Sequence, residues 1–317
     1  MNPLNYLMRP GLSVTGRGKL TILIYHRVHA VVDALFPSAA DARRFDEQMS
    51  WISALLNIIP LPEAIGMLRE DRLPGRAACI TFDDGYADNV DVALPILLRH
   101  GLSATFFVAS GFLDGGRMWN DTIIEAFRRA PGTVADLEHL GLGRRVIDTP
   151  ASRRAAIDEV IDKLKYAAPV TRQEQVDALA RTIGENLPDD MMMRSDQVRA
   201  LHAAGMTIGA HTVTHPILMQ IDPREALAEI RGGREALQSI LDAPVRLFAY
   251  PNGKPGTDYG PAHVAMVREL GFLAAMSTRR GAADTSSDLH QLPRFTPWGR
   301  TLLRFGIGLA RNHLGHY

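Results

Sequence analysis

The sequence has one cysteine, no net charge and no long hydrophobic run. Cys79 has no second cysteine to pair with, which excludes an internal disulfide and is compatible with a reducing compartment. The 35 Lys and Arg residues are matched by 35 Asp and Glu residues, so the chain lacks the basic excess of a nucleic-acid-binding protein. No stretch approaches the roughly 18 consecutive apolar residues that a membrane-spanning helix needs.

The two ends of the chain lack further signals. Pro10 and Gly16 interrupt the apolar residues near the N-terminus, which makes a poor secretory signal, so we expect a cytoplasmic protein. The C-terminal segment, about 298–317, mixes arginine with apolar residues at loose helical spacing, although Gly306 weakens a helix there. We expect this amphipathic tail to pack against the rest of the protein, with peripheral contact to an acidic inner-membrane surface as the alternative.

Short apolar runs alternate with helical patterns along most of the 317 residues. This alternation is typical of an α/β fold with a largely parallel sheet. The expected strands cover 21–25, 77–82, 104–108, 206–210, 245–249, 272–277 and 290–295. The expected helices cover 42–57, a segment starting at Pro62, 93–99, 195–204, 223–241 and 261–270.

The alternation breaks between about 114 and 194. This stretch shows helical patterns near Asn120, from Arg153 to Tyr166 and from Gln173 to Ile183, but no convincing strand. We therefore predict a helical insertion within a single domain spanning 1–317. The insertion separates the segments that carry the candidate functional residues, so it either overhangs their site or pads the outside of the fold.

Two adjacent carboxylates, Asp83 and Asp84, end the apolar run 77–82. Successive side chains of a strand point to opposite faces, so both can reach one pocket only if the strand ends there, and Gly85 allows the backbone to turn away. Two neighbouring carboxylates also repel each other unless a cation pairs with one of them. The simpler alternative is a turn, because Asp-Gly is a common turn signal.

Two histidines, His211 and His215, follow a predicted strand at a spacing of four residues. That spacing suits one face of a helix, but Pro216 pushes the residue before it out of the α region and favours a strand end or loop. Thr212 stands where the metalloprotease motif HExxH has its glutamate, which excludes that motif. Two imidazoles and one carboxylate would supply a hydrolytic metal site, with the other carboxylate as its base.

A third string, Phe248-Ala-Tyr-Pro-Asn-Gly253, follows another predicted strand and ends in a turn dipeptide. It is either a simple turn or a wall of the site formed by Tyr250, Pro251 and Asn252. In the second interpretation the backbone N–H of Asn252 faces a developing oxyanion.

These strings resemble the motifs of the polysaccharide deacetylases of carbohydrate esterase family 4, which are related to the chitooligosaccharide deacetylases of nodulation. The resemblance covers about 20–295 apart from the insertion. It implies a distorted (β/α) barrel of about seven strands that removes N-acetyl groups from a polysaccharide, oligosaccharide or lipid-linked amino sugar and releases acetate. Asp83 falls on the position of the general base. Asp84, His211 and His215 fall on the ligands of a divalent metal, which the resemblance implies is Zn²⁺, with Co²⁺, Ni²⁺ or Mn²⁺ as alternatives.

Two departures from the family pattern leave the catalytic acid open. Ala249 stands where the third motif usually has arginine, and the C-terminal Leu-x-His motif is not evident. One branch, similar to the biofilm poly-N-acetylglucosamine deacetylases and regarded as circularly permuted, begins with a strand ending in Tyr-His, which Leu23-Ile-Tyr-His-Arg-Val28 matches. This resemblance makes His26 the acid, with His290 as an alternative, and gives Arg294 the role of supporting the base.

The predicted function is therefore N-deacetylation of an N-acetylated glycan, with no nucleic-acid partner. One alternative is another hydrolase of non-peptide carbon–nitrogen bonds on the same fold, acting on a cyclic or linear amide. The other is a glycan-binding module that has lost turnover. The altered third motif favours the binding module, whereas the complete set of two aspartates and two histidines favours an enzyme.

Overall fold

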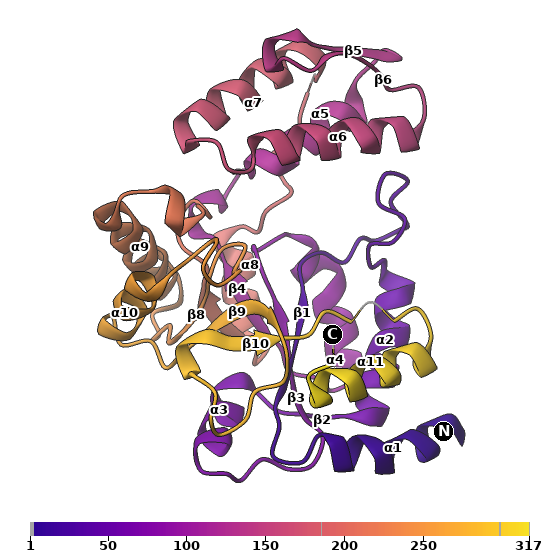
Figure 1. The fold of residues 1–317 in the computed structure, drawn as a ribbon, viewed down its shortest axis with the longest axis vertical. Helices are drawn as coiled ribbons and strands as arrows, with labels where there is room; N and C mark the ends of the chain where they lie inside the picture. The colour runs from indigo at the N-terminus through magenta and orange to yellow at the C-terminus, as the bar shows by residue number, and fades with distance from the viewer. Residues whose placement is uncertain (1–2, 185, 298, 317) are drawn as a thin grey trace.

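The computed structural model describes residues 3–184, 186–297 and 299–316. Figure 1 shows a body of strands flanked by helices and, above it, an insertion of helices and one hairpin. Among the described helices, none combines the length and the apolar character that crossing a bilayer requires.

Seven parallel strands form a nearly closed barrel, as predicted. In sheet order they are β1 (Thr21–Tyr25), β3 (Ala77–Phe82), β4 (Thr105–Val108), β7 (Thr207–Ala210), β8 (Leu247–Ala249), β9 (Ala274–Arg280) and β10 (Leu292–Arg294), and β2 (Asn57–Ile58) also pairs with β3. The ring closes just after β10, where the N–H of Phe295 donates to Ile22 O at 2.8 Å and the N–H of Ile24 donates to Phe295 O at 3.1 Å. Because all these strands are parallel, their carboxyl ends meet at one rim of the barrel.

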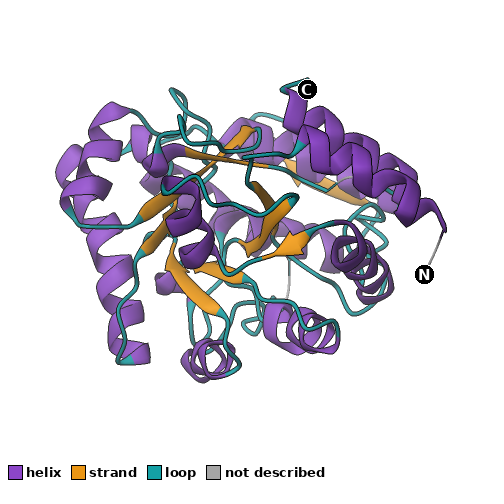
Figure 2. Cartoon of the chain, turned by 90° about the horizontal axis from the view of Figure 1, so that it is seen from below, coloured by secondary structure: helices purple, strands orange, loops and turns teal. Residues whose placement is uncertain are grey.

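Helices surround the barrel, as the view from below shows (Figure 2). They are α2 (Ala42–Leu55), α3 (Leu61–Arg69), α4 (Leu94–Arg99, after a π-helical turn at Asn89–Ala93), α8 (Ser195–Ala203), α9 (Pro223–Leu241) and α10 (Pro261–Glu269). Each matches a helix expected from the apolar periodicity.

Strand alternation divides the barrel core into two layers. One set of side chains fills the interior, and it includes Ile22, Cys79, Phe107, Leu247 and Met276. The residues between them face the surrounding helices. Both layers are apolar, which is why the strands of a parallel sheet read as unbroken apolar runs. Cys79 is buried at 1% exposure, and burial raises the pKa of its thiol, as expected of an inert cysteine.

The insertion has a hydrophobic core of its own, formed by α5 (Trp119–Arg129), α6 (Pro150–Leu164) and α7 (Pro169–Ile183). The expectation that it contains no strand is wrong, because β5 (Val134–Leu137) and β6 (Gly143–Val146) form an antiparallel hairpin. The side chains of β5 alternate between exposed and buried, and β6 is rich in arginine. A search for apolar runs therefore misses both strands.

The two ends of the chain pack together. Helix α1 (Pro3–Thr15), for which the sequence carries no clear signal, lies against α11 (Leu302–Leu314). Gly306 of α11 makes this contact close, since a Cβ there would overlap with Met8 Cε. The described part of the predicted tail thus packs against the protein, while Trp298 and Tyr317 lie outside the described residues.

Gly233 of α9 provides a test of how the helices position the rim of the barrel. A Cβ at this residue would lie 2.5 Å from the backbone oxygen of Thr212, in the loop after β7. We expect Gly233→Ala to displace this loop and to lower the free energy of unfolding in urea by about 1–3 kcal/mol.

The control is Gly66→Ala in α3, where a Cβ would meet no atom within 4 Å. This change should raise the free energy of unfolding by about 0.5–1 kcal/mol, as alanine generally does in helices. Equal effects of the two substitutions would show that the contact of α9 with the loop is not tight.

Candidate active site

Asp83 and Asp84 lie at the carboxyl end of β3, where the chain turns away from the barrel. The N–H of Asp83 still donates to Tyr25 O of β1 at 3.0 Å, but Asp84 and Gly85 have φ values of 78° and 92°. A Cβ on Gly85 would also lie 2.9 Å from Val108 Cγ1, so both the turn and the packing require glycine. The strand end therefore allows two adjacent carboxylates, 2% and 8% exposed, to point in different directions.

His211 and His215 lie in a loop after β7, as Pro216 predicts, and not on a helix. Thr212 and His215 have φ values of 66° and 54°, a conformation that bends the loop sharply. Glu229 of α9 accepts hydrogen bonds from two successive backbone N–H groups of the loop, both at 2.8 Å. Helix α9 thus fixes a strained loop that carries both imidazoles.

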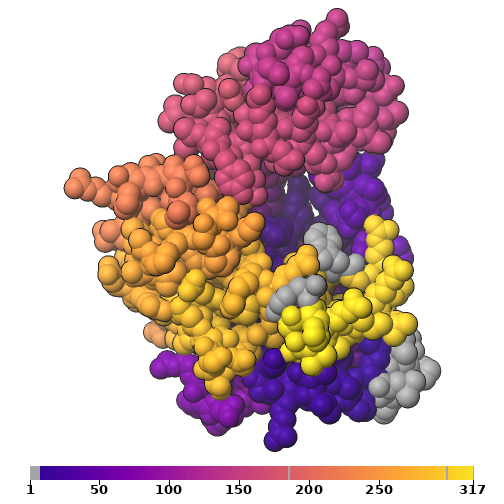
Figure 3. Space-filling model, in the orientation of Figure 1, coloured from indigo at the N-terminus to yellow at the C-terminus, as the bar shows by residue number. Residues whose placement is uncertain are grey.

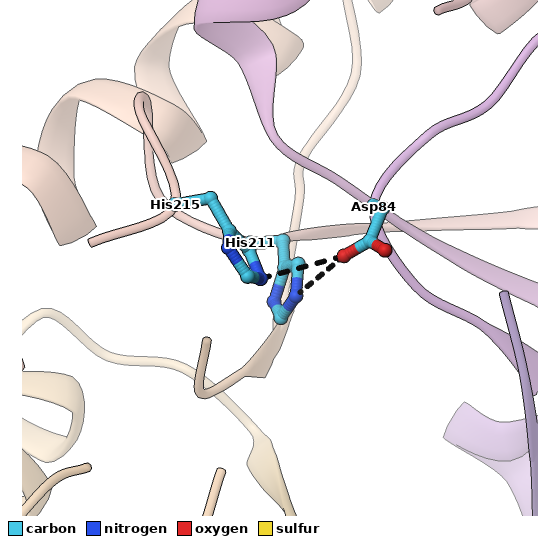
Figure 4. Close-up of side chains that lie close together, drawn as sticks. All are labelled: Asp84, His211 and His215. Atoms are coloured by element: carbon cyan, nitrogen blue, oxygen red, sulfur yellow. Dashed lines mark ion pairs between the residues drawn. The ribbon is translucent and has the colours of Figure 1, made fainter. Parts of the chain in front are cut away.

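Asp84, His211 and His215 point at one another (Figure 4). The Nε2 atoms of the two histidines each lie 3.4 Å from Asp84 Oδ1. Ligands about 2.0–2.1 Å from a tetrahedral ion would stand about 3.4 Å apart, so this spacing fits a metal ion between them. Ala249 O lies 2.7 Å from His211 Nδ1, which places the proton on Nδ1 and leaves Nε2 free to bind a metal.

The electrostatics of the three side chains also suit a cation. Burial lowers the pKa of His215 to about 4, with the neighbouring His211 adding to the effect, so this ring is neutral at pH 7. Burial alone would raise the pKa of Asp84 and lower that of His211. Their mutual contact outweighs burial, lowering the pKa of Asp84 and raising that of His211. An ionised carboxylate thus lies between two imidazoles in a buried site.

Asp83 forms a buried ion pair with Arg294 at the end of β10. The two guanidinium nitrogens Nη1 and Nη2 donate to the two carboxylate oxygens, each at 2.7 Å, and the exposure of Arg294 is 1%. Arg294 Nε also donates to Ser277 O at 2.8 Å, which fixes the plane of the guanidinium. Burial would raise the pKa of Asp83, but the charge of Arg294 lowers it, so the carboxylate is ionised.

The two histidines considered for the acid lie in different places. His26, the residue after β1, is exposed and lines one cavity together with Asp83 and Asp84. His290 does not line this cavity, since its Nε2 lies 3.0 Å from Phe272 O and its Nδ1 accepts from Arg268 Nε at 3.3 Å. Of the two, only His26 lines the cavity beside Asp84.

The third string contributes only one of its three residues to the cavity. Asn252 lines it, with its backbone oxygen accepting from Thr278 Oγ1 at 2.8 Å. Tyr250 is fully buried outside the barrel interior, where its ring stacks on that of Tyr259 with 3.7 Å between the ring centres. Neither Tyr250 nor Pro251 lines the cavity. Tyr250 therefore does not form a wall of the site. The alternation of side chains along a strand continues past β8 and turns this ring toward the surrounding helices.

Comparison with known proteins identifies the family of this fold and site. A model of the polysaccharide deacetylase family matches residues 70–131 and 158–275, more than half of the chain. The chain belongs to the polysaccharide deacetylase family. Members of this family hydrolyse the amide bond of N-acetyl groups, and the protein is a hydrolase of this class. The matched ranges include both aspartates and both histidines of the site but neither His26 nor Arg294.

Three of the similar proteins share 20% of their residues with this chain. YxkH of Bacillus subtilis (strain 168) is 20% identical over 302 residues, which are 94% of this chain and 76% of that protein. The structure of IcaB from Ammonifex degensii aligns with a TM-score of 0.60 at 20% identity, covering 92% of this chain and 97% of that one. The Streptococcus pyogenes deacetylase PplD, solved with acetate, gives 0.58 at 20% identity, covering 88% and 92%. At these identities the likeness to the two structures is one of fold.

In this polysaccharide deacetylase the insertion forms the roof of the site. Side chains from α5, α6 and α7 and their flanks face Asp84, His211 and His215 across a cavity of about 250 Å³, and they include Trp119, Asn120, Ile161, Lys165 and Arg172. Figure 3 shows the surface hollowed between the insertion and the barrel. Of the two expectations for the insertion, the structure shows that it overhangs the site. Sequence reasoning identified none of these roof residues.

Hydrogen bonds join both ends of the insertion to the loops that carry Asp84 and the two histidines. The N–H of Gly111, just before the insertion, donates to Val213 O of the histidine loop at 2.8 Å. The N–H of Met193, at its far end, donates to Gly85 O at 2.9 Å. The run Met191–Met193 is buried, as expected of a structural contact, and it lies against the turn that follows Asp84.

A second cavity, of about 370 Å³, adjoins the first and shares His26, Asp84 and Asn120 with it. Asp121 of α5 lines this second cavity and is 2% exposed. Its carboxyl accepts a hydrogen bond from the hydroxyl of Tyr86 at 3.0 Å, which ties the insertion to the aspartate loop. Burial raises the pKa of Asp121 to about 7, so near neutral pH this carboxyl holds a proton in about half of the molecules.

We expect Asp121 to make the metal-free protein less stable as the pH rises. Between about pH 4 and 7 its carboxyl is ionised in the unfolded chain and protonated in the folded one, so the folded state binds more protons. The free energy of unfolding then falls with pH, by up to about 4 kcal/mol from this group. Asp121→Asn keeps an acceptor for Tyr86 and removes this titration.

Urea unfolding at pH 5 and pH 8 measures the effect. Asp121→Asn should differ little from the wild type at pH 5 and should be the more stable protein at pH 8. The control, Asp162→Asn, changes an exposed carboxyl of the same insertion and should reproduce the wild-type pH dependence. If Asp121→Asn also retained that dependence, Asp121 would not be its source.

Proposed function

We propose that this protein hydrolyses the acetamide of an N-acetylated amino sugar in a metal-dependent reaction, releasing acetate and a free amine. One observation carries the proposal. Asp84, His211 and His215 direct one oxygen and two nitrogens at a common point, and a second carboxylate, Asp83, lines the same cavity without taking part in that set. The family supports N-deacetylation as the reaction.

Asp84, His211 and His215 would hold the metal. Two imidazoles and a carboxylate are a donor set that zinc uses in catalytic sites, so we propose Zn²⁺ as the ion. When bound, it would polarise the acetamide carbonyl and make a water molecule more acidic.

Asp83 would take a proton from the water that attacks the acetamide carbon. Arg294 occupies both carboxylate oxygens of Asp83, which keeps this base ionised and stops it from rotating. Each oxygen retains a second lone pair for the water. A base held by two hydrogen bonds is positioned before the substrate arrives, which lowers the entropy cost of the proton transfer.

His26 and Asn252 would act on the two groups that change charge as the tetrahedral intermediate forms and collapses. His26, exposed at the edge of the cavity, would donate a proton to the departing amine. The backbone N–H of Asn252 has no backbone acceptor among the described residues and would donate to the oxyanion. Asn252 has a φ of 58°, and Thr278 fixes its carbonyl group, so this N–H is held in place.

Metal content and acetate release from one purified sample test the function. We expect about one divalent ion per chain, acetate from N-acetylated sugars, and loss of activity on chelation that returns when Zn²⁺ is added. Release of product from imides or ureides but not from acetamido sugars would identify a different amide hydrolase. Bound metal without turnover of any acetylated glycan would instead identify a binding module.

Replacing the base gives a sharper test. Asp83→Asn should retain the metal, because Asp83 is not among the three ligands, and should lower kcat by about 10²–10⁴, as loss of a general base does. Metal analysis and acetate release are measured on the same preparation. Activity near the wild-type level would exclude Asp83 as the base.

The assignment of the acid is tested separately. His26→Ala should lower kcat for acetamido sugars by about 10²–10⁴ and leave the metal content unchanged. An activated ester with a good leaving group needs no proton on that group, so its hydrolysis should suffer much less. The control is His290→Ala, since His290 lies outside the cavity. A larger loss from His290→Ala than from His26→Ala would reverse the assignment.

A further inference from the structure

Arg172 is an unusual residue in the roof of the site. It lies in the first turn of α7, is 7% exposed and lines the cavity that contains Asp84, His211 and His215. A cation is unfavourable near the N-terminus of a helix, because the helix dipole is positive there. A buried arginine normally has a carboxylate partner that offsets the free-energy cost of removing the guanidinium from water.

Within residues 3–184, 186–297 and 299–316, Arg172 has no such partner. The one hydrogen bond of its guanidinium runs from Nη1 to Lys165 O at 3.2 Å, and the guanidinium carbon lies 4.8 Å from the centre of the Trp119 ring. Burial lowers the pKa of Arg172, and no nearby carboxylate offsets the effect. The stacking on Trp119 fixes the direction of the guanidinium but leaves most of its donors available to the cavity.

Lys165, at the end of α6, is a second cation on the same side. It lines the same cavity and forms no ion pair in the described part of the chain, although its ammonium group lies 5.5 Å from the ring of Tyr166. The two cations come from different helices but are joined through the hydrogen bond of Arg172 to the backbone of Lys165. They form one unit, which we call the cationic roof.

The charges around the cavity do not balance. Its lining contains two carboxylates, Asp83 and Asp84, and the two cations of the roof. Arg294 already neutralises the charge of Asp83. A divalent ion bound to Asp84 would add two positive charges, which is more than the single negative charge of Asp84 can neutralise. A loaded site therefore has an excess of positive charge, and a neutral sugar would not compensate it.

We propose that the cationic roof binds a phosphate or diphosphate group on the same molecule whose acetamide lies at Asp84. This inference rests on the proposed function and specifies its substrate: a phosphate-bearing N-acetylamino sugar and not an uncharged glycan. A phosphate monoester carries about −1.5 to −2 charges near pH 7, which matches the two cations. Arginine supplies a planar pair of donors for phosphate oxygens, and lysine supplies a point charge.

A purely structural role of Arg172 makes a different prediction for the variants. If Arg172 only packed on Trp119, a side chain of similar length without charge would serve as well, and Lys165 would be irrelevant. The roof would then affect every substrate equally. The two roles can therefore be separated by comparing charged and neutral substrates.

The first experiment compares KM for acetate release from four substrates: N-acetylglucosamine, its trimer, N-acetylglucosamine 1-phosphate and UDP-N-acetylglucosamine. We expect the two phosphate-bearing substrates to have KM values at least tenfold lower in the wild type. Arg172→Met and Lys165→Met should each raise those KM values by about 10- to 100-fold, the loss expected for a charged hydrogen bond. KM for the neutral sugars should not change, and Arg172→Lys should restore part of the loss.

Matched controls remove the same charges elsewhere. The control substitutions are Arg181→Met in α7 and Lys163→Met in α6, and both residues are exposed. Neither substitution should alter KM for any of the four substrates. Far-UV circular dichroism and the melting temperature show whether Arg172→Met is folded, and Arg172→Lys and Lys165→Met test the proposal if it is not.

The second experiment does not depend on turnover. Isothermal titration calorimetry of N-acetylglucosamine 1-phosphate into the metal-free protein should show binding that Arg172→Met and Lys165→Met weaken and the two controls do not. UDP-N-acetylglucosamine and a vesicle containing a polyprenyl diphosphate sugar then distinguish a nucleotide-linked from a lipid-linked source of the phosphate.

Three results would overturn the proposal. Equal KM values for neutral and phosphate-bearing sugars in the wild type would show that the roof does not select for charge. Equal losses on neutral and charged substrates in Arg172→Met would assign it a structural role. N-acetylmuramic acid carries a carboxylate and no phosphate. If its KM were lower than the KM of both phosphate-bearing sugars, the group bound by the roof would be a carboxylate and not a phosphate. By contrast, absence of acetate from every acetamido sugar would contradict the proposed function, while the calorimetry would still test the anion site.

Discussion

The buried ion pair between Asp83 and Arg294 is the constraint on which the rest of the site depends. It joins the turn after β3 to the end of β10, two strands that lie on either side of β1 where the barrel closes. Removing one partner would leave a buried charge without compensation, at a cost of about 3–5 kcal/mol. Because Arg294 binds both carboxylate oxygens of Asp83, the carboxylate that turns toward the histidines is that of Asp84. Two chemically identical neighbours thereby acquire different roles.

The barrel, and the convergence of Asp84, His211 and His215, could be predicted because their signals are local. A strand of a parallel sheet is covered on both faces, so β3 reads as the unbroken apolar run Ala77–Phe82. Gly85 marks the turn, and Pro216 moves the histidines off a helix. Family resemblance assigns Arg294 to the base, whereas the geometry that pairs it with Asp83 depends on barrel closure, which no local pattern encodes.

The remaining features depend on alternation or on three-dimensional placement. The hairpin β5–β6 lies half exposed and carries no apolar run, so the insertion was expected to be purely helical. Tyr250 was expected in the site, whereas strand alternation turns it outward. The residues of the cationic roof have ordinary helical neighbours in the sequence, and nothing local distinguishes Arg172 from the exposed arginine at position 181. Only the packing of α5, α6 and α7 over the barrel shows that it is buried and faces the ligands.

The hydrogen bonds that join the insertion to the two ligand loops have a consequence for how such a protein can diverge. The chain leaves the barrel beside the histidine loop and returns beside the aspartate loop, so the insertion is attached to both loops, while Asp84, His211 and His215 themselves lie outside it. Replacement of everything between these two attachment points would leave the hydrolytic set intact and exchange the surface above it. The fold is in this sense modular, because the barrel loops carry Asp84 and the two histidines and the insertion supplies the surface above them. Divergence in substrate choice should therefore be concentrated in the segment between Gly111 and Met193.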